Sequence, residues 1–144
     1  MTAPIFVDSN VLLYALDDTD KQKQKLANRW RAVLWSNRRG RVSFQVLQEF
    51  YVNAIRLRPT SGDLARAEVR DLLAWNPIAI DGPLLERGWT LQDRYHLSFW
   101  DSLIVAAAGV ASCAYLLTED LQPGQNFDGV EVISPFQREP ETIL

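Results

Sequence analysis

The sequence predicts an α/β fold: a three-layer α/β/α sandwich around a central, mostly parallel sheet of four to five strands. Short apolar runs of strand length alternate with longer segments of helical spacing, which is typical of a parallel sheet covered by helices on both faces. The 144 residues are 47% hydrophobic and 23% charged, which suits one sizeable core. No repeat, linker or low-complexity block divides them, so we expect residues 1–144 to form a single domain.

The first half of the chain alternates two expected strands with four expected helices. The run from Pro4 to Asp8 is apolar until its final acid, which indicates a buried strand. In segment 45–57 the apolar residues recur every three or four positions, which indicates an amphipathic helix, and Pro59 and Gly62 end it. The expected strands are 4–8 and 41–44, and the expected helices are 11–16, 21–35, 45–57 and 63–75.

The second half continues this alternation. Gly82-Pro83 suits the start of a helix, because proline is tolerated in the first turn. Residues 99–112 are apolar on nearly every side, so we expect a buried helix there. The expected strands are 77–80, 114–117 and 131–133, and the expected helices are 82–95 and 99–112. Ligands of such sheets bind beyond the carboxyl ends of the strands, so functional residues are expected at that edge.

Four acidic residues lie where this topology allows them to meet. Asp8 directly follows the first strand, and Asp120 follows a later strand by three residues. Asp101 lies in the first turn of the buried helix, and Glu49 lies at the margin of the apolar stripe of 45–57. Carboxylates that meet at one edge repel each other, and a divalent cation removes that conflict. Oxygen ligands of this kind suit Mg²⁺ or Mn²⁺.

Each acid taken alone has a plainer explanation. Asp8 can cap the helix that follows it, and Ser98-Phe-Trp-Asp101 fits a capping box. Glu49 alone is typical of a solvated helix surface, and Glu119-Asp120 of a polar loop. Only the convergence of all four at one sheet edge favours a metal site over these explanations.

The sequence has few residues that would suit other kinds of functional site. A net charge of −3 provides no overall basic field for nucleic acid, so binding to RNA needs a local patch. Cys113 is the only cysteine, which excludes an internal disulfide and a cysteine zinc site and predicts a buried thiol. His96 is the only histidine and no nucleophile elbow accompanies it, so we expect a structural role. Segment 124–129 lacks the lysine of a phosphate-binding loop.

Targeting signals are also missing from the sequence. The N-terminus has no basic region of the signal-peptide type. No apolar stretch reaches the roughly 18 residues that a membrane span needs. We therefore expect a soluble cytoplasmic protein without a membrane partner.

Several motifs, in order along the chain, carry a family resemblance. They are Phe6-Val-Asp8-Ser-Asn10-Val-Leu-Leu-Tyr14, Gln45-x-x-x-Glu49-Phe-Tyr51, Leu97-Ser-Phe-Trp-Asp101-Ser-Leu-Ile-Val-Ala-Ala-Ala108, Leu117-Thr-Glu-Asp120-Leu-Gln, Gly124-Gln125-x-Phe127 and Ile133-Ser-Pro-Phe136. With these motifs the chain resembles the PIN domain family, and within it the VapC toxins of bacterial toxin–antitoxin pairs. The opening motif alone is a weak signal, whereas the ordered set of acids in these contexts is specific.

The resemblance implies a Mg²⁺-dependent endoribonuclease that hydrolyses RNA phosphodiester bonds. It also implies that the protein forms a homodimer and binds a cognate antitoxin protein. The acidic positions of the family align with Asp8, Glu49, Asp101 and Asp120, which the resemblance makes catalytic and metal-binding residues. Asn10 and Thr118 align with polar positions near that site, and Asn126 is a weaker candidate. Four arginines are candidates for holding an RNA strand, although surface solvation explains such arginines more often: Arg56, Arg58, Arg66 and Arg70.

Three other functions stay open at this point. A phosphatase of the haloacid-dehalogenase type also has an aspartate after its first strand, but it needs a second aspartate where this chain has Asn10. It also needs a lysine before the later acidic pair, and none precedes Glu119-Asp120. A PIN-like module that binds without cutting, or a housekeeping RNA-processing nuclease, also has these motifs. The sequence does not identify the RNA target.

Overall fold

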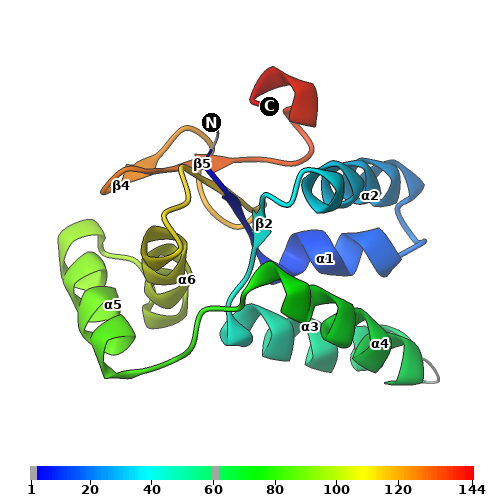
Figure 1. Cartoon of the computed structure of the whole chain (residues 1–144), viewed down its shortest axis with the longest axis horizontal. Helices are drawn as coiled ribbons and strands as arrows, with labels where there is room; N and C mark the ends of the chain where they lie inside the picture. The colour runs from blue at the N-terminus through cyan, green and yellow to red at the C-terminus, as the bar shows by residue number, and fades with distance from the viewer. Residues whose placement is uncertain (1–2, 60–61) are drawn as a thin grey trace.

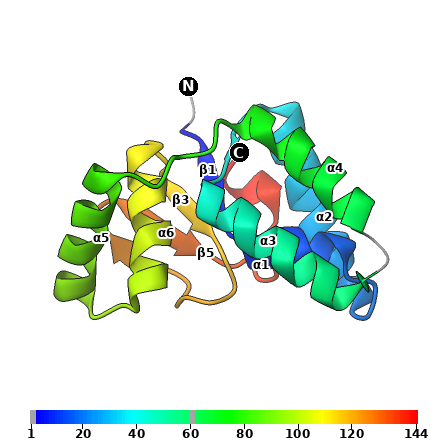
Figure 2. The same ribbon diagram turned by 90° about the horizontal axis from the view of Figure 1, so that it is seen from below.

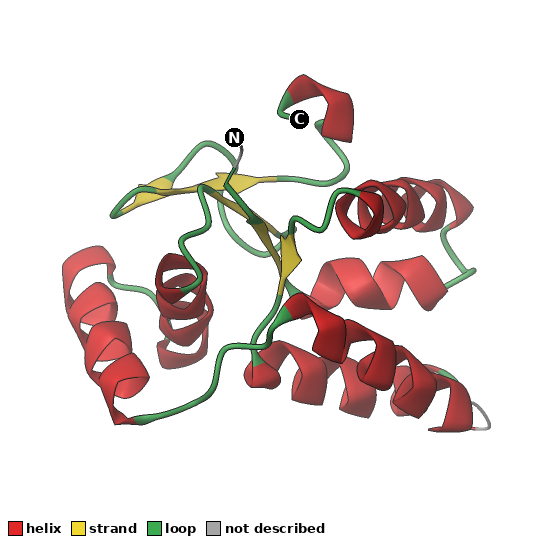
Figure 3. Cartoon of the chain, in the orientation of Figure 1, coloured by secondary structure: helices red, strands yellow, loops and turns green. Residues whose placement is uncertain are grey.

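The computed structural model describes residues 3–59 and 62–144, and their strands form one five-stranded sheet in the order β2-β1-β3-β5-β4 (Figure 3). The strands are β1 (Ile5–Val7), β2 (Gly40–Arg41), β3 (Tyr115–Leu117), β4 (Asn126–Phe127) and β5 (Val130–Ile133). β1 pairs in parallel with β2 and β3, and β3 pairs in parallel with β5. Only β4 is antiparallel, at the edge beside β5. The sheet is therefore mostly parallel, as predicted.

Helices cover both faces of this sheet. Those of the described residues are α1 (Ser9–Leu16), α2 (Lys21–Ser36), α3 (Phe44–Leu57), α4 (Gly62–Leu72), α5 (Gly82–Tyr95) and α6 (Phe99–Val110), with short 3₁₀ turns η2 (Leu73–Trp75) and η3 (Pro140–Thr142). Figures 1 and 2 show α5 and α6 together on one side of the sheet and α1 to α4 on the other. The predicted three-layer α/β/α sandwich is confirmed.

Local sequence signals explain where these helices begin. The side chains of Asp20, Ser43, Asp81 and Ser98 each accept the backbone N–H three residues ahead, at the starts of α2, α3, α5 and α6. Such caps satisfy backbone donors that the first turn leaves without partners. The predicted burial of α6 is confirmed for residues 102–108, whereas Trp100 at its start is 64% exposed.

Two predicted strands and one predicted loop are corrected by the structure. Segment 77–80 is not a strand: Ile78 forms a single parallel bridge with Ser43, and Pro77 has no N–H with which to extend the ladder. The expected strand 41–44 ends at Arg41, because Ser43 instead caps α3. The segment that contains strand β4 was expected to be a polar loop. Phe127 of this strand is buried and packs in the core.

Two residues that the sequence left without a catalytic role lie in structural settings. Cys113 is buried, and burial raises the pKa of its thiol to about 12, which confirms the expected inert thiol. His96 ends α5 in the left-handed region, with φ of 57°, and its N–H donates to the Gln92 carbonyl. No helix in the described parts of the chain combines the length and the apolar character needed to cross a membrane.

Candidate active site

The site begins at the carboxyl ends of two neighbouring strands. Val7 of β1 and Leu117 of β3 are register partners, so Asp8 and Thr118, which follow them, emerge side by side. The Thr118 hydroxyl donates to Asp8 Oδ2 at 2.8 Å, and both residues are buried. The parallel pairing of β1 and β3 thus brings together residues that are 110 positions apart in the sequence.

Asp8 combines a capping role with a place in a charged cluster. Its Oδ1 accepts the Ser9 N–H at 2.7 Å at the start of α1, as the capping explanation predicts. Burial raises the pKa of Asp8 to about 6, while the hydrogen bonds from Thr118 and Ser9 oppose that shift. The negative charges of Asp120 and Asp101 raise the pKa further. The capping explanation and the acidic-cluster explanation therefore both hold for this residue.

Glu49 faces the same cluster from α3. Its pKa is raised to about 7, mainly by burial and further by the negative charges of Asp8, Asp101 and Asp120. Its Oε1 atom is buried and has no hydrogen-bond partner. A buried carboxylate oxygen without a partner is costly, so Glu49 Oε1 is an acceptor poised for a cation or a proton donor.

The other two acids complete the cluster from more exposed positions. Asp101 lies in the first turn of α6. Its N–H donates to Ser98 Oγ at 3.1 Å, which is the bond that the N-terminal serine of the expected capping box makes. Asp120 is exposed and follows β3 in the loop. Both carboxylates act electrostatically on Asp8 and Glu49, so the structure brings all four predicted acids into mutual range.

The cluster is not closed in this conformation. Within residues 3–59 and 62–144, no three acidic, histidine or cysteine side chains are arranged as a ready group of metal ligands. The role of Asp8, Glu49, Asp101 and Asp120 as metal ligands therefore stays a prediction.

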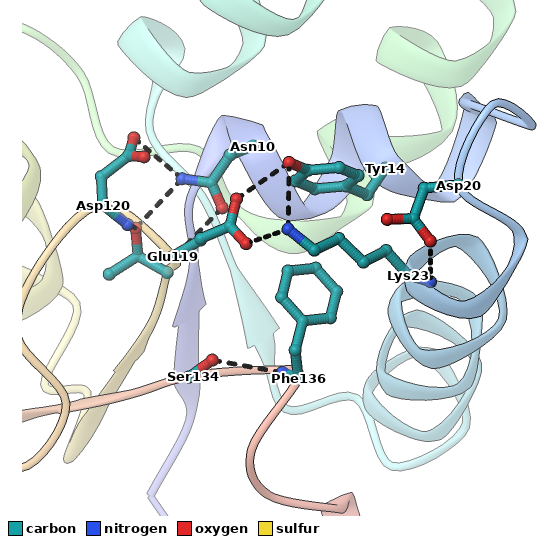
Figure 4. Close-up of polar contacts among 9 residues, drawn as sticks. Asn10, Tyr14, Asp20, Lys23, Glu119, Asp120, Ser134 and Phe136 are labelled. Carbon is teal, nitrogen blue, oxygen red and sulfur yellow. Dashed lines mark hydrogen bonds and ion pairs between the residues drawn. The ribbon is translucent and has the colours of Figure 1, made fainter.

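Asn10 links the acids through its amide. Its Nδ2 donates to Thr118 Oγ1 at 3.0 Å and lies 3.3 Å from Asp8 Oδ2. It also donates to Asp120 Oδ2 at 3.0 Å (Figure 4). Its Oδ1 accepts the Glu119 N–H at 3.2 Å. Asn10 and Thr118, the two polar candidates from the sequence, thus lie between the acids and fix the relative positions of Asp8 and Asp120.

We expect Asn10→Asp to destabilise the metal-free protein by about 2 kcal/mol at pH 7.5. The change replaces the donating Nδ2 with a charged oxygen beside Asp8 and Asp120, at nearly the same volume. Urea unfolding of the two proteins measures the difference. Asn37→Asp, the same change at an exposed position, is the control and is expected to shift the free energy of unfolding by about 0.5 kcal/mol or less. Equal stability of Asn10→Asp and the parent would contradict this role.

A second network, which the sequence analysis missed, holds the neighbouring Glu119 away from the cluster (Figure 4). The Tyr14 hydroxyl donates to Glu119 Oε1 at 2.9 Å, and Lys23 Nζ forms an ion pair with Glu119 Oε2. The ammonium lies 4.7 Å from the Tyr14 ring centroid and 4.9 Å from that of Phe136. Four separate segments supply these residues, so no sequence spacing signals the network. Of the two neighbouring acids Glu119 and Asp120, only the Asp120 carboxylate accepts a hydrogen bond from the Asn10 side chain in the described residues.

The remaining sequence candidates lie outside the acidic cluster, and three of them have side-chain contacts of their own. Arg58 pairs with Asp18, and Arg66 Nε donates to the Tyr51 hydroxyl at 3.1 Å. The Asn126 Oδ1 atom accepts the Gly129 N–H at 2.8 Å and so closes the turn between β4 and β5. Arg56 and Arg70 lie in the last turns of α3 and α4. Binding of RNA by these arginines stays a prediction.

Comparisons with known structures identify the fold. A toxin–antitoxin complex from Klebsiella pneumoniae superposes with a TM-score of 0.65 at 20% identity, over 94% of this chain and 100% of that chain. VapC20 of Mycobacterium tuberculosis, described as a Sarcin-Ricin loop cleaving toxin, gives 0.62 at 21% identity, over 78% and 86%. DNA-bound VapBC of Salmonella typhimurium gives 0.66 at 13% identity, over 93% and 99%. At these identities the likeness shows the fold.

The sequence comparisons identify the family. A search of curated protein sequences gave no significant match. The family model of the PIN domain matches residues 5–125, a range that holds Asp8, Glu49, Asp101 and Asp120. Because that match covers most of the 144 residues, the chain belongs to the PIN domain family.

Proposed function

We propose that this chain is a Mg²⁺-dependent endoribonuclease that acts as the toxin of a toxin–antitoxin pair. The observation that carries the proposal is the buried Glu49 Oε1 atom, which has no partner and faces a cluster of three further carboxylates. A structural acid in a protein core would have a hydrogen bond or an ion pair at each oxygen. A buried carboxylate oxygen without a hydrogen-bond partner, close to other carboxylates, is typical of a site that binds a cation.

The residues present fit Mg²⁺ or Mn²⁺. The donor set is all oxygen: Asp8, Glu49, Asp101 and Asp120 would hold the ion, with water completing its shell. The cluster also needs positive charge, because the charges of its members raise the pKa values of Asp8 and Glu49 beyond the effect of burial. When bound, the ion would lower the pKa of a bound water and stabilise charge on the scissile phosphate.

The chain's own residues would then position the reactants and move the proton. Asn10 and Thr118 hold the Asp8 and Asp120 carboxylates in fixed positions by hydrogen bonds. Glu49 is suited to accept the proton of the attacking water, because its Oε1 has no hydrogen-bond partner. That water would attack the phosphorus in line with the departing ribose oxygen, which takes up a proton from solvent, so the RNA chain breaks at one phosphodiester bond.

The toxin assignment rests on the fold relatives. Two of them are complexes of a toxin with its antitoxin, and a third is a toxin that cleaves the Sarcin-Ricin loop. A protein antitoxin is therefore the proposed partner of this chain, and a homodimer its proposed assembly. An RNA that contains the Sarcin-Ricin loop is the first substrate to test.

The decisive experiment is cleavage of defined RNAs by the purified protein with Mg²⁺, with Mn²⁺ and with EDTA. We expect specific cuts that need the metal, and loss of those cuts in Glu49→Gln. Asp93→Asn is the matched control, since Asp93 is exposed on α5 outside the cluster, and its activity should equal the parent's. Cleavage in EDTA, or full activity of Glu49→Gln, would contradict the proposal.

Parallel assays distinguish the alternatives. Turnover of a small phosphomonoester without RNA cleavage would indicate a phosphatase instead, and calorimetry without Mn²⁺ binding at millimolar concentration would indicate a silent binding module. RNA cleavage without growth arrest on induced expression would indicate a housekeeping nuclease. Growth arrest that is relieved by co-expression of the neighbouring reading frame is the expected result for a toxin.

A further inference from the structure

A second polar cavity lies beside β2, and its lining contains none of the four acids. It has a volume of about 570 Å³ and is lined by Trp35, Arg38, Arg41, Ala74, Trp75 and Asn76. These residues belong to the end of α2 and the turn after it, to β2, and to η2 and the residue that follows it. Asp8 and Thr118 follow the carboxyl ends of β1 and β3, which run parallel to β2.

The aromatic part of this cavity is fixed by backbone packing. Trp75 is buried against Gly40, where an added Cβ atom would come within 2.6 Å of the indole ring. Trp35 lies beside it, with ring centroids 6.0 Å apart and planes tilted by 40°, yet it is 45% exposed. The buried Trp75 ring thus packs against the exposed Trp35 ring, and Trp35 contributes a flat aromatic surface to the cavity lining.

The charged part of the cavity is positive and has no acidic side chain in its lining. The Arg41 Nη1 atom donates to the carbonyls of Gly40 at 2.8 Å and of Arg38 at 3.1 Å, which orients the guanidinium. In the described parts of the chain, neither a hydrogen bond nor an ion pair engages the exposed guanidinium of Arg38. Arg38 and Asn76 also have positive φ angles, 56° and 52°, so both turns of the lining are held in a strained backbone conformation.

An exposed indole beside two arginines without carboxylate partners matches the two parts of a nucleotide. Guanidinium groups bind phosphate oxygens in a bidentate manner, and aromatic rings stack with bases irrespective of base identity. The volume is within the range of pockets that hold small organic ligands. We propose that this cavity binds one nucleotide unit, with its phosphate on Arg38 and Arg41 and its base on Trp35.

This proposal goes beyond the nuclease activity and does not depend on it. The nucleotide comes either from the free pool or from a single-stranded RNA, and both sources present the same phosphate and base. Calorimetric titrations in EDTA with adenosine monophosphate and with a 2′-O-methylated ten-residue oligoadenylate separate the two sources without cleavage. Saturable binding of the mononucleotide indicates a free-nucleotide site, and binding of the oligonucleotide alone indicates an RNA-strand site.

The variants test the assignment of residues. Trp35→Ala and Arg38→Glu are expected to weaken binding about tenfold or more, which corresponds to the loss of one stacked base or one phosphate contact. Lys25→Glu makes the same change of charge at an exposed position of α2, and its affinity should stay within about twofold of the parent's. Trp35 and Arg38 are both exposed, so thermal melting should show folded variants.

The same titrations can overturn the proposal. Absence of binding by both ligands, or equal affinity of the parent, Trp35→Ala and Arg38→Glu, would exclude a nucleotide site in this cavity. The titrations use EDTA and ligands that are not cleaved, so they need no nuclease activity. A failure of the nuclease proposal therefore leaves this test intact, and the reverse also holds.

Discussion

Asp8→Asn is expected to lower kcat/KM for RNA cleavage on the order of 1,000-fold while the chain still folds. The substitution removes one full negative charge from the cluster, and with it the strongest type of ligand that Mg²⁺ finds there. The amide oxygen of asparagine can still accept the Ser9 N–H that Asp8 Oδ1 accepts at 2.7 Å. The effect should therefore appear in catalysis and metal affinity rather than in folding.

Single-turnover cleavage and calorimetric titration with Mn²⁺ measure these two effects. Asp81→Asn is the matched control, because Asp81 also caps a helix through its carboxylate, at α5, but lies outside the cluster. It should cleave RNA as the parent does. If Asp8→Asn and Asp81→Asn retained equal activity, Asp8 would be only a helix cap and the proposed metal site would be wrong.

The second large effect concerns pH in the absence of metal: the Asp8 carboxyl should make the free energy of unfolding fall by on the order of 3 kcal/mol from about pH 4 to pH 7. The pKa of Asp8 is raised from 3.8 to about 6 in the folded protein, mainly by burial. Between these values the folded state holds the proton and the unfolded state has released it, so rising pH favours unfolding. The pKa of Glu49, raised to about 7, extends the same trend upward.

Urea unfolding at several pH values between 4.5 and 7.5, in EDTA, measures this slope. The comparison is with Asp8→Asn, which lacks the carboxyl, so the difference between the two proteins isolates it from all other groups. The exposed acids Asp18, Asp128 and Glu141 have lowered pKa values and act in the opposite direction at lower pH. Parallel curves for the parent and Asp8→Asn would mean that Asp8 titrates normally. Saturating Mg²⁺ should remove the difference in slope, because a bound cation favours the charged carboxylate.

Local signals in the sequence were enough to predict most of the elements. Helix starts follow from single side chains such as Ser43, Asp81 and Ser98, whose caps bond within three residues. The apolar runs that became β1 and β3 end at the polar residues Asp8 and Thr118, and parallel strands buried on both faces need such runs. Parallel order then places Asp8 and Asp120 at one edge without further information.

The exceptions are positions where a distant partner decides. Segment 77–80 has the apolar content of a strand, but Pro77 limits it to one bridge with Ser43. Segment 126–127 has too little periodicity to be noticed, and it becomes β4 because β5 offers an antiparallel partner. In both cases the sequence pattern is weak or misleading, and pairing across the fold determines the outcome.

The sequence by itself determined the fold class and the identity of the four acids, because periodicity and helix caps act over a few residues. Only the tertiary structure decided how those acids are surrounded. The open Oε1 of Glu49, the amide of Asn10 between Asp8 and Asp120, and the cavity beside Trp35 all depend on contacts between segments distant in the chain. Desolvation and charge repulsion arise from that packing, so the raised pKa values of Asp8 and Glu49 have no signature in the sequence.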